Sequence, residues 1–183
     1  MSKLRDSISI LKKNHVIIEK GLMLSELKEI ETIYGVVFPK ELKSFFSNIL
    51  PVSQGFYNWR DFSDDNVAYI KAQMRVPAEN ILRQIDEVEW SDTWGFKPSD
   101  SEKTKEILRL KILDAPKMIP FLGHRYIPEN DYDKCPVVSI HGIDVVYYGY
   151  GIEEFLAVEY GIKSQNSVHF EKIPNIDFWS DLI

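Results

Sequence analysis

Apolar side chains recur at every third or fourth position in several segments of the first 113 residues, which is typical of helices that bury one face. The segments are residues 24–34, 39–50, 64–76 and 101–113. We expect Gly35 to end the first helix, Pro39 to begin the second and Pro77 to break the third, after which a short helix restarts. Ser25 and Ser101 are the expected N-caps of the first and last of these helices.

The segment 119–149 has a different pattern, with short runs rich in Val, Ile, Tyr and Phe that are bounded by Gly, Pro, Asn and Asp. This pattern is typical of consecutive strands joined by turns. The aromatic-rich segment 56–62 predicts a further strand with Tyr57, Trp59 and Asp61 on one side, and a helix is expected over 151–160. Because the strands are grouped, we predict a single α+β domain over residues 22–183, with a central, mostly antiparallel sheet flanked by helices. Residues 1–21 are expected to form either a docked amphipathic helix or a loose arm.

The composition indicates a globular protein of 183 residues, with one cysteine that cannot form an internal disulfide. The formal net charge is −6, and because residues 1–20 carry five bases against two acids, the remainder carries −9. An acidic body repels nucleic acid and favours basic partners, although mild acidity also serves solubility alone. Neither a signal peptide nor a run of about 18 apolar residues is evident. We therefore expect a cytoplasmic protein with no nucleic-acid and no membrane partner, whose apolar segment 173–183 docks on the body.

The strand segment also holds the residues that first suggest chemistry: His124, Arg125, Cys135 and His141. Their spacing matches no metal-binding motif, so neither a metal nor another cofactor is expected. A catalytic dyad of the cysteine with either histidine has no local signature to support it. An arginine beside a histidine suits a phosphate, but a structural ion pair with a carboxylate such as Asp144 is favoured. We therefore predict no catalytic residues and no enzymatic activity.

A second notable segment, 90–98, places two tryptophans and a phenylalanine close together. Rings of this size bury a large area, so an aromatic lid over the core is favoured over a stacking site for a sugar or a base. The acidic residues around this segment would repel the phosphates of a nucleic acid. Acidic pairs elsewhere, such as Glu153 and Glu154, are expected to lie in hydrated positions that leave their acidity unchanged.

Several boxes along the chain occur together in an order that resembles a known family. They are Phe38-Pro39, Trp90-x-x-x-Trp94-Gly95-x-x-Pro98, Ile119-Pro-x-Leu-Gly-His-Arg-Tyr-Ile-Pro128, Pro136-Val-x-Ser-Ile140, Asp144-Val-Val-Tyr-Tyr-Gly149 and Phe155-Leu156. In these residues the sequence resembles the SUKH superfamily, in the branch of fungal cell-wall-assembly and killer-toxin-resistance regulators. The resemblance covers roughly residues 22–160, and Gln54-Gly55 stands where the family often has Asn-Gly.

This resemblance implies an α+β fold and, as in many bacterial members, an immunity protein that neutralises a cognate toxin by direct binding. A basic, nuclease-like toxin would suit the acidic body. The alternatives are a regulatory scaffold of cell-wall or signalling proteins and, third, an enzyme that uses Cys135 or His124. The resemblance itself assigns no contact residues. From charge and aromatic character we expect the partner-binding surface among Trp59, Asp61, Asp64, Asp65, Asp86, Glu87, Glu89, Trp90 and Asp92.

Overall fold

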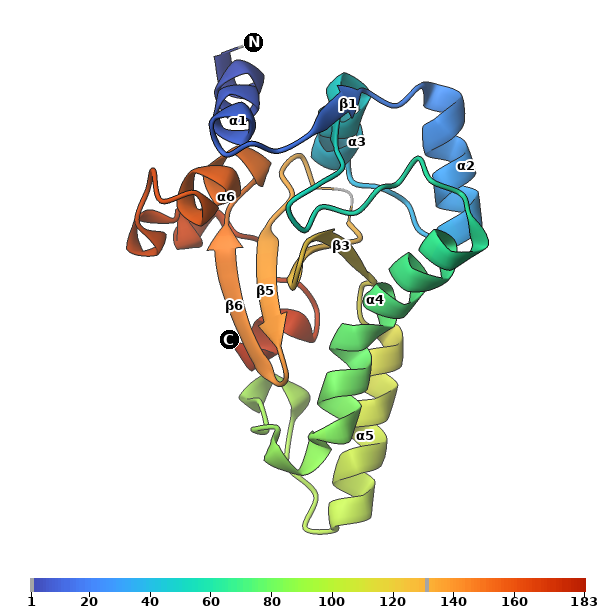
Figure 1. The fold of residues 1–183 in the computed structure, drawn as a ribbon. Helices are drawn as coiled ribbons and strands as arrows, with labels where there is room; N and C mark the ends of the chain where they lie inside the picture. The colour runs from blue at the N-terminus through green and yellow to red at the C-terminus, as the bar shows by residue number, and fades with distance from the viewer. Residues whose placement is uncertain (1, 131) are drawn as a thin grey trace.

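The computed structural model describes residues 2–130 and 132–183, and Figure 1 shows its arrangement. Within these residues the helices are α1 (Ser2–Lys13), α2 (Leu24–Tyr34), α3 (Lys40–Asn48), α4 (Asp64–Arg83), α5 (Ser101–Asp114) and α6 (Ile152–Glu159). The strands are β1 (Ile18–Lys20), β2 (Ile49–Pro51), β3 (Met118–Leu122), β4 (Arg125–Pro128), β5 (Val137–His141) and β6 (Asp144–Gly149). The fold is α+β, as predicted from the grouping of the strands.

The central sheet is an antiparallel meander in the order β3-β4-β5-β6, and β1 pairs with β2 in a separate small sheet. The apolar run 119–128 forms two strands because the chain turns at Gly123, whose φ of 52° lies in the left-handed region. Gly142, with a φ of 64°, provides the corresponding turn between β5 and β6. Glycine suits both turns because it has no Cβ to clash in this conformation.

Both faces of the sheet are buried, each in its own hydrophobic cluster. One cluster joins α1, α2, α3 and α6 to the sheet residues Ile119, Phe121, Ile127 and Val137. The other joins the end of α4, α5 and the C-terminal segment to the sheet residues Met118, Tyr126, Val138, Ile140 and Val145. The alternation of neighbouring residues between the two clusters follows from the two-residue period of a strand. The sheet therefore separates two regions that can be compared directly.

The two ends of the chain are both packed against the body. Helix α1 contacts α6 (Figure 1), with Ile10 and Leu11 buried, so the docked helix and not the loose arm is found. In the C-terminal segment Ile176, Phe178 and Trp179 are buried, as expected from its apolar sequence. None of the helices in the described ranges has the length and apolarity needed to cross a membrane.

Helix α4 corrects the prediction of a break at Pro77, because the helix runs unbroken through it. Proline has no N–H to donate to the preceding turn, which normally ends or kinks a helix. Here Ile70, Pro77 and Ile81 are all buried along the helix, so tertiary packing compensates for the missing hydrogen bond. The expected pair of short helices is therefore one continuous element.

The strand predicted over 56–62 is also wrong. Only Phe56 forms a bridge, to Leu122, and the residues that follow form a loop. The N-caps differ from those predicted as well: Met23 caps α2, with its amide donating to Glu26, and the carboxylate of Asp100 caps α5. Gly35 does end α2 in the left-handed conformation, as predicted.

Candidate interaction surface

The acidic residues predicted to bind a partner do not form one surface. All are exposed, but they lie in two groups at opposite ends of α4. The members are Asp61, Asp64 and Asp65 at its start, and Asp86, Glu87, Glu89 and Asp92 beyond its end. A helix of 20 residues is about 30 Å long, whereas a typical contact patch of ~800 Å² per partner has a radius of roughly 16 Å. A patch centred on one group therefore leaves the other outside.

Trp59, predicted as an aromatic anchor, has no exposed surface at all, which removes it from the binding surface. Its ring lies 5.0 Å from that of Tyr34 and 5.1 Å from that of Phe38, both in edge-to-face geometry. Aromatic rings prefer such offset contacts, which add to the stabilisation from burial. Trp59 is a central core residue.

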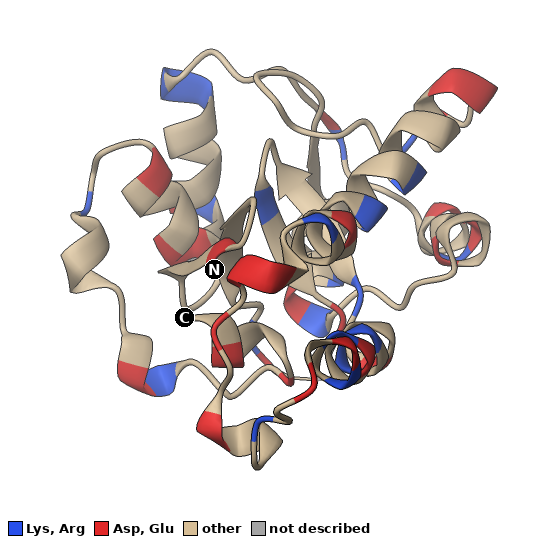
Figure 2. Cartoon of the chain, turned by 90° about the horizontal axis from the view of Figure 1, so that it is seen from below, with Lys and Arg blue, Asp and Glu red and all other residues tan. Residues whose placement is uncertain are grey.

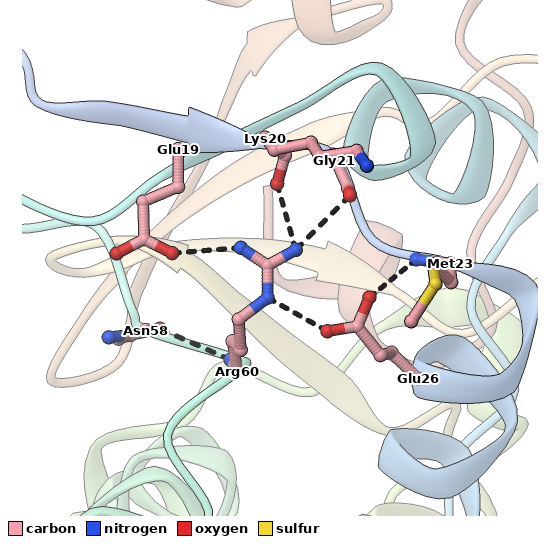
Figure 3. A network of polar contacts seen from close by, with 7 residues as sticks. All are labelled: Glu19, Lys20, Gly21, Met23, Glu26, Asn58 and Arg60. Carbon is pink, nitrogen blue, oxygen red and sulfur yellow. Dashed lines mark hydrogen bonds and ion pairs between the residues drawn. The ribbon is translucent and has the colours of Figure 1, made fainter.

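The loop between Phe56 and α4 is held by the guanidinium of Arg60, which Figure 3 shows from close by. Its Nε donates to Glu26 at 2.8 Å, and one terminal nitrogen donates to Glu19, also at 2.8 Å. The other terminal nitrogen donates to the carbonyl oxygens of Lys20 and Gly21, at 2.8 and 3.1 Å. Arg60 thus ties this loop to β1 and α2, which explains its defined shape without strand pairing.

The first acidic group has local structural roles. The carboxylate of Asp61 accepts a hydrogen bond of 2.9 Å from the Ser63 amide, and this bond lowers the pKa of Asp61. Asp64 and Asp65 lie in the first turn of α4, where a negative charge favours the positive end of the helix dipole. These local roles explain the three acidic residues without the need for a binding partner.

The second acidic group belongs to a projecting segment, residues 84–100, that we call the acidic lobe. It contains the short 3₁₀ helices Ile85–Glu87 and Asp92–Trp94 and lies at the far end of α4 and α5 (Figure 1). Five carboxylates and one lysine give it a formal charge of −4. Acidic and basic positions are interleaved along α4 and α5 (Figure 2), so the lobe differs in charge from the two helices that it joins.

The tryptophans of the acidic lobe hold it to the C-terminal segment. Trp94 stacks on Phe178, with ring centroids 5.8 Å apart and planes at 11°, and its Nε1 donates to Asp181 at 2.6 Å. Trp90 meets Trp94 edge to face at 5.5 Å and donates from its Nε1 to the Gly95 carbonyl oxygen. Trp90 is half-buried, so part of its side chain remains at the surface. The lid predicted for these two tryptophans is present.

Phe96 does not belong to that lid. It is fully exposed, at 103% relative accessible area, and it follows Gly95, whose φ of 80° is a conformation that favours glycine. Sequence reasoning grouped Phe96 with the tryptophans and missed its exposure. The available signal was its position between Gly95 and Pro98, two residues typical of turns.

Arg125 has a structural role, but its partner is not Asp144 as predicted. The buried guanidinium lies 3.3 Å from Glu159, donates to the Ser139 hydroxyl at 3.0 Å and packs 4.1 Å from the centre of the Tyr148 ring. The side chain extends toward Tyr148 and α6, whereas Asp144 lies at the other end of β6. Arg125 therefore contacts β5, β6 and α6, although its Nε has no hydrogen-bond partner among the described residues.

The cysteine and the histidines of the strand segment are not brought together. Cys135 is buried beside Glu41 of α3, and burial raises its pKa to about 12. The rings of His124 and His141 lie 6.0 Å apart at the far end of β5, a strand whose length alone is about 13 Å. Burial and the neighbouring Arg125 charge lower the pKa of His124. The structure therefore does not form the dyad considered as a catalytic alternative.

Glu154 departs from the expectation of a hydrated carboxylate. Its side chain is largely buried and accepts hydrogen bonds from the Tyr150 amide at 3.0 Å and from His169 Nδ1 at 2.6 Å. Burial by itself would raise the pKa of Glu154, but these hydrogen bonds outweigh it, and the pKa is lowered. Glu154 thus joins α6 to the C-terminal region.

Over residues 2–130 and 132–183, no group of three or more His, Cys, Asp and Glu side chains is placed to hold a metal ion. Comparisons of the sequence and structure with protein-family models, curated proteins and solved structures find no match.

Proposed function

We propose that this protein binds a basic protein partner through its acidic lobe, and that the partner is a toxin which it neutralises without enzymatic chemistry of its own. The observation that carries the binding site is the full exposure of Phe96 within a segment of charge −4. A large apolar ring surrounded by charge is the arrangement of an interface anchor, in which aromatic burial supplies affinity and the charges guide association.

The two parts of the proposal have different support. The lobe is supported by its geometry: Trp90 and Trp94 fix it against the C-terminal segment, so that Phe96 is presented on an ordered support. Preorganisation of this kind reduces the entropy lost on binding. The toxin as partner is supported by the resemblance of the sequence to the SUKH superfamily. Arg125, Cys135 and His124 have packing roles that are consistent with a binding protein.

The test is growth protection against any toxin domain found to be encoded beside this gene, combined with calorimetric measurement of binding. Phe96→Ala should weaken binding about 30-fold, the effect of losing a hot-spot residue. A variant with amides at Asp86, Glu87, Glu89 and Asp92 should slow association about tenfold at low salt. The matched control is Asp64→Asn with Asp65→Asn, which changes charge at the other end of α4 and should leave binding unchanged.

Full protection by both lobe variants would contradict the proposed surface. If no adjacent toxin is bound, but a cell-wall or signalling protein binds in a Phe96-dependent manner, the regulatory scaffold would replace the toxin in the proposal. Circular dichroism and thermal unfolding of each variant establish that a loss of binding is not a loss of fold.

A further inference from the structure

A large cavity of about 860 Å³ lies between α4 and α5, away from the acidic lobe. The two helices run side by side in opposite directions (Figure 1), and the end of α2 and the start of β3 close the groove. Its apolar lining includes Ile33, Met74, Ala78, Ile112, Met118 and Trp179. A volume of this order with mostly apolar walls is typical of a binding groove.

Two leucines on the walls of the groove are exposed. Leu113 of α5 has 82% of its area accessible and Leu82 of α4 has 40%. Helix α5 buries Ile112, whereas the next residue, Leu113, is exposed. Apolar side chains gathered around an open groove indicate a contact surface, whereas single exposed leucines elsewhere need no explanation.

The charge around the groove is opposite to that of the protein as a whole. Its described lining holds Lys71, Arg75, Arg109 and Lys117 against a single acid, Glu79, although the chain carries −6 overall. Glu79 is paired with Arg75 at 3.4 Å. Lys71 and Arg109 have no ion-pair partner among the residues that the structure describes. The groove thus combines an apolar floor with an excess of positive charge.

The dimensions of the groove suit a helix. Along α4 it extends from Lys71 to Leu82, a distance of about 16 Å, which corresponds to three helical turns. The cations come from α4, α5 and the residue before β3, so they are spread around the rim. A ligand with a single anionic head group would lie near one part of the rim, whereas acids along a helix can face cations on all three elements.

From these observations we infer that the groove binds an amphipathic helix of a partner protein, with its apolar face on the groove floor and its acidic residues toward Lys71, Arg75, Arg109 and Lys117. Binding of a helix in a groove through apolar residues three or four positions apart is a common mode of peptide recognition. This surface is separate from the acidic lobe and selects the opposite charge, so it goes beyond the function proposed above.

The probe is a fluorescent peptide of about 14 residues, with leucines on one helical face and glutamates on the others. Two control peptides have lysine in place of every glutamate, or the same composition in scrambled order. Anisotropy at low salt gives affinity. Methyl NMR of the four methionines locates the site, because Met74 and Met118 line the groove and Met23 is exposed outside it. We expect saturable binding that shifts Met74 and Met118 but not Met23.

The lysine and scrambled peptides should bind at least tenfold more weakly. Lys71→Glu combined with Arg109→Glu should reduce the affinity for the acidic peptide about tenfold, and Leu113→Glu should do the same. The matched controls are Lys103→Glu and Leu110→Glu, both exposed on α5 outside the groove, which should leave the affinity unchanged. If a glutamate variant fails to fold, Arg109→Gln and Leu113→Ala replace it and should weaken binding about threefold.

Several results would overturn the inference. These are the absence of saturable binding at millimolar peptide, equal binding of the scrambled peptide, or equal losses in the control variants. Methyl shifts with laurate but not with the peptide would identify a lipid ligand, and groove-dependent dimerisation in sedimentation would identify a second copy of the chain. The toxin assay is independent: groove variants should retain full protection while lobe variants lose it.

Discussion

The two faces of the central sheet are covered in different ways. On one face, the cluster with α1, α2, α3 and α6 is centred on Trp59 and closed by the Arg60 network. On the other, α4 and α5 leave Leu82 and Leu113 exposed at a groove, and the acidic lobe leaves Phe96 exposed at a separate place. Apolar area left in water gives up stabilisation that burial would supply. The two binding surfaces that we propose therefore both lie on the second side of the sheet, whereas Trp59 and Arg60 lie on the first.

The largest expected effect comes from Trp59, at the centre of the first region. Trp59→Ala should lower the free energy of unfolding by about 3–5 kcal/mol, because it removes a fully buried ring and leaves a cavity among Tyr34, Phe38 and Phe46. Chemical denaturation measures this loss. Trp59→Phe is the matched control: it keeps an aromatic contact and removes an indole N–H that has no hydrogen-bond partner among the described residues. Trp59→Phe should lose clearly less unfolding free energy than Trp59→Ala. Equal losses in the two variants would show that packing of the aromatic ring is not the cause.

Arg60 should have the next largest effect. Arg60→Met retains the aliphatic stem and removes the hydrogen bonds to Glu19 and Glu26, and we expect a loss of about 2 kcal/mol at neutral pH. The Arg75→Met control removes a more exposed pair with Glu79 and should cost no more than about 0.5 kcal/mol.

The pH dependence of the Arg60 variant provides an independent check. The hydrogen bond from Arg60, followed by that from the Met23 amide, lowers the pKa of Glu26 below its usual 4.5. A carboxylate whose pKa is lowered by folding stabilises the folded state fully at pH values above its unfolded pKa. This stabilisation is lost as the pH falls through the folded pKa. The difference between wild type and Arg60→Met should therefore narrow below pH 4.5. If the difference in unfolding free energy between wild type and Arg60→Met stayed constant until the protein unfolds in acid, the ion pair with Glu26 would not be its source.

The sequence was informative where local chemistry decides the structure. The helical spacing of 24–34 with Gly35 behind it, and the grouped strands of 119–149, predicted elements that are present. Pro77 and the loop 56–62 were predicted wrongly because long-range contacts decide both. The burial of Pro77 maintains α4, and Arg60 holds the loop through partners about 40 residues earlier in the chain.

The candidate surface was less predictable than the fold. The only local difference that separates the exposed Phe96 from the buried Trp59 is the pair of turn residues beside it, Gly95 and Pro98. The charge of residues 86–92 was visible in the sequence, but its separation from Asp64 and Asp65 depended on α4 remaining unbroken. The groove could not be found because its cations come from three elements whose contact is set by tertiary packing.

The exposed side chains of Phe96 and Leu113 should have the smallest effects on stability. Phe96→Ser and Leu113→Ser, made singly, should change the free energy of unfolding by no more than about 0.5 kcal/mol, because each side chain is already exposed. Denaturation under the conditions used for Trp59→Ala gives the direct contrast. A loss of about 2 kcal/mol in either variant would assign that residue to the fold, and its exposure would no longer support a binding site. A negligible loss would be consistent with the binding roles that we propose for these two side chains, which the peptide and toxin assays test directly.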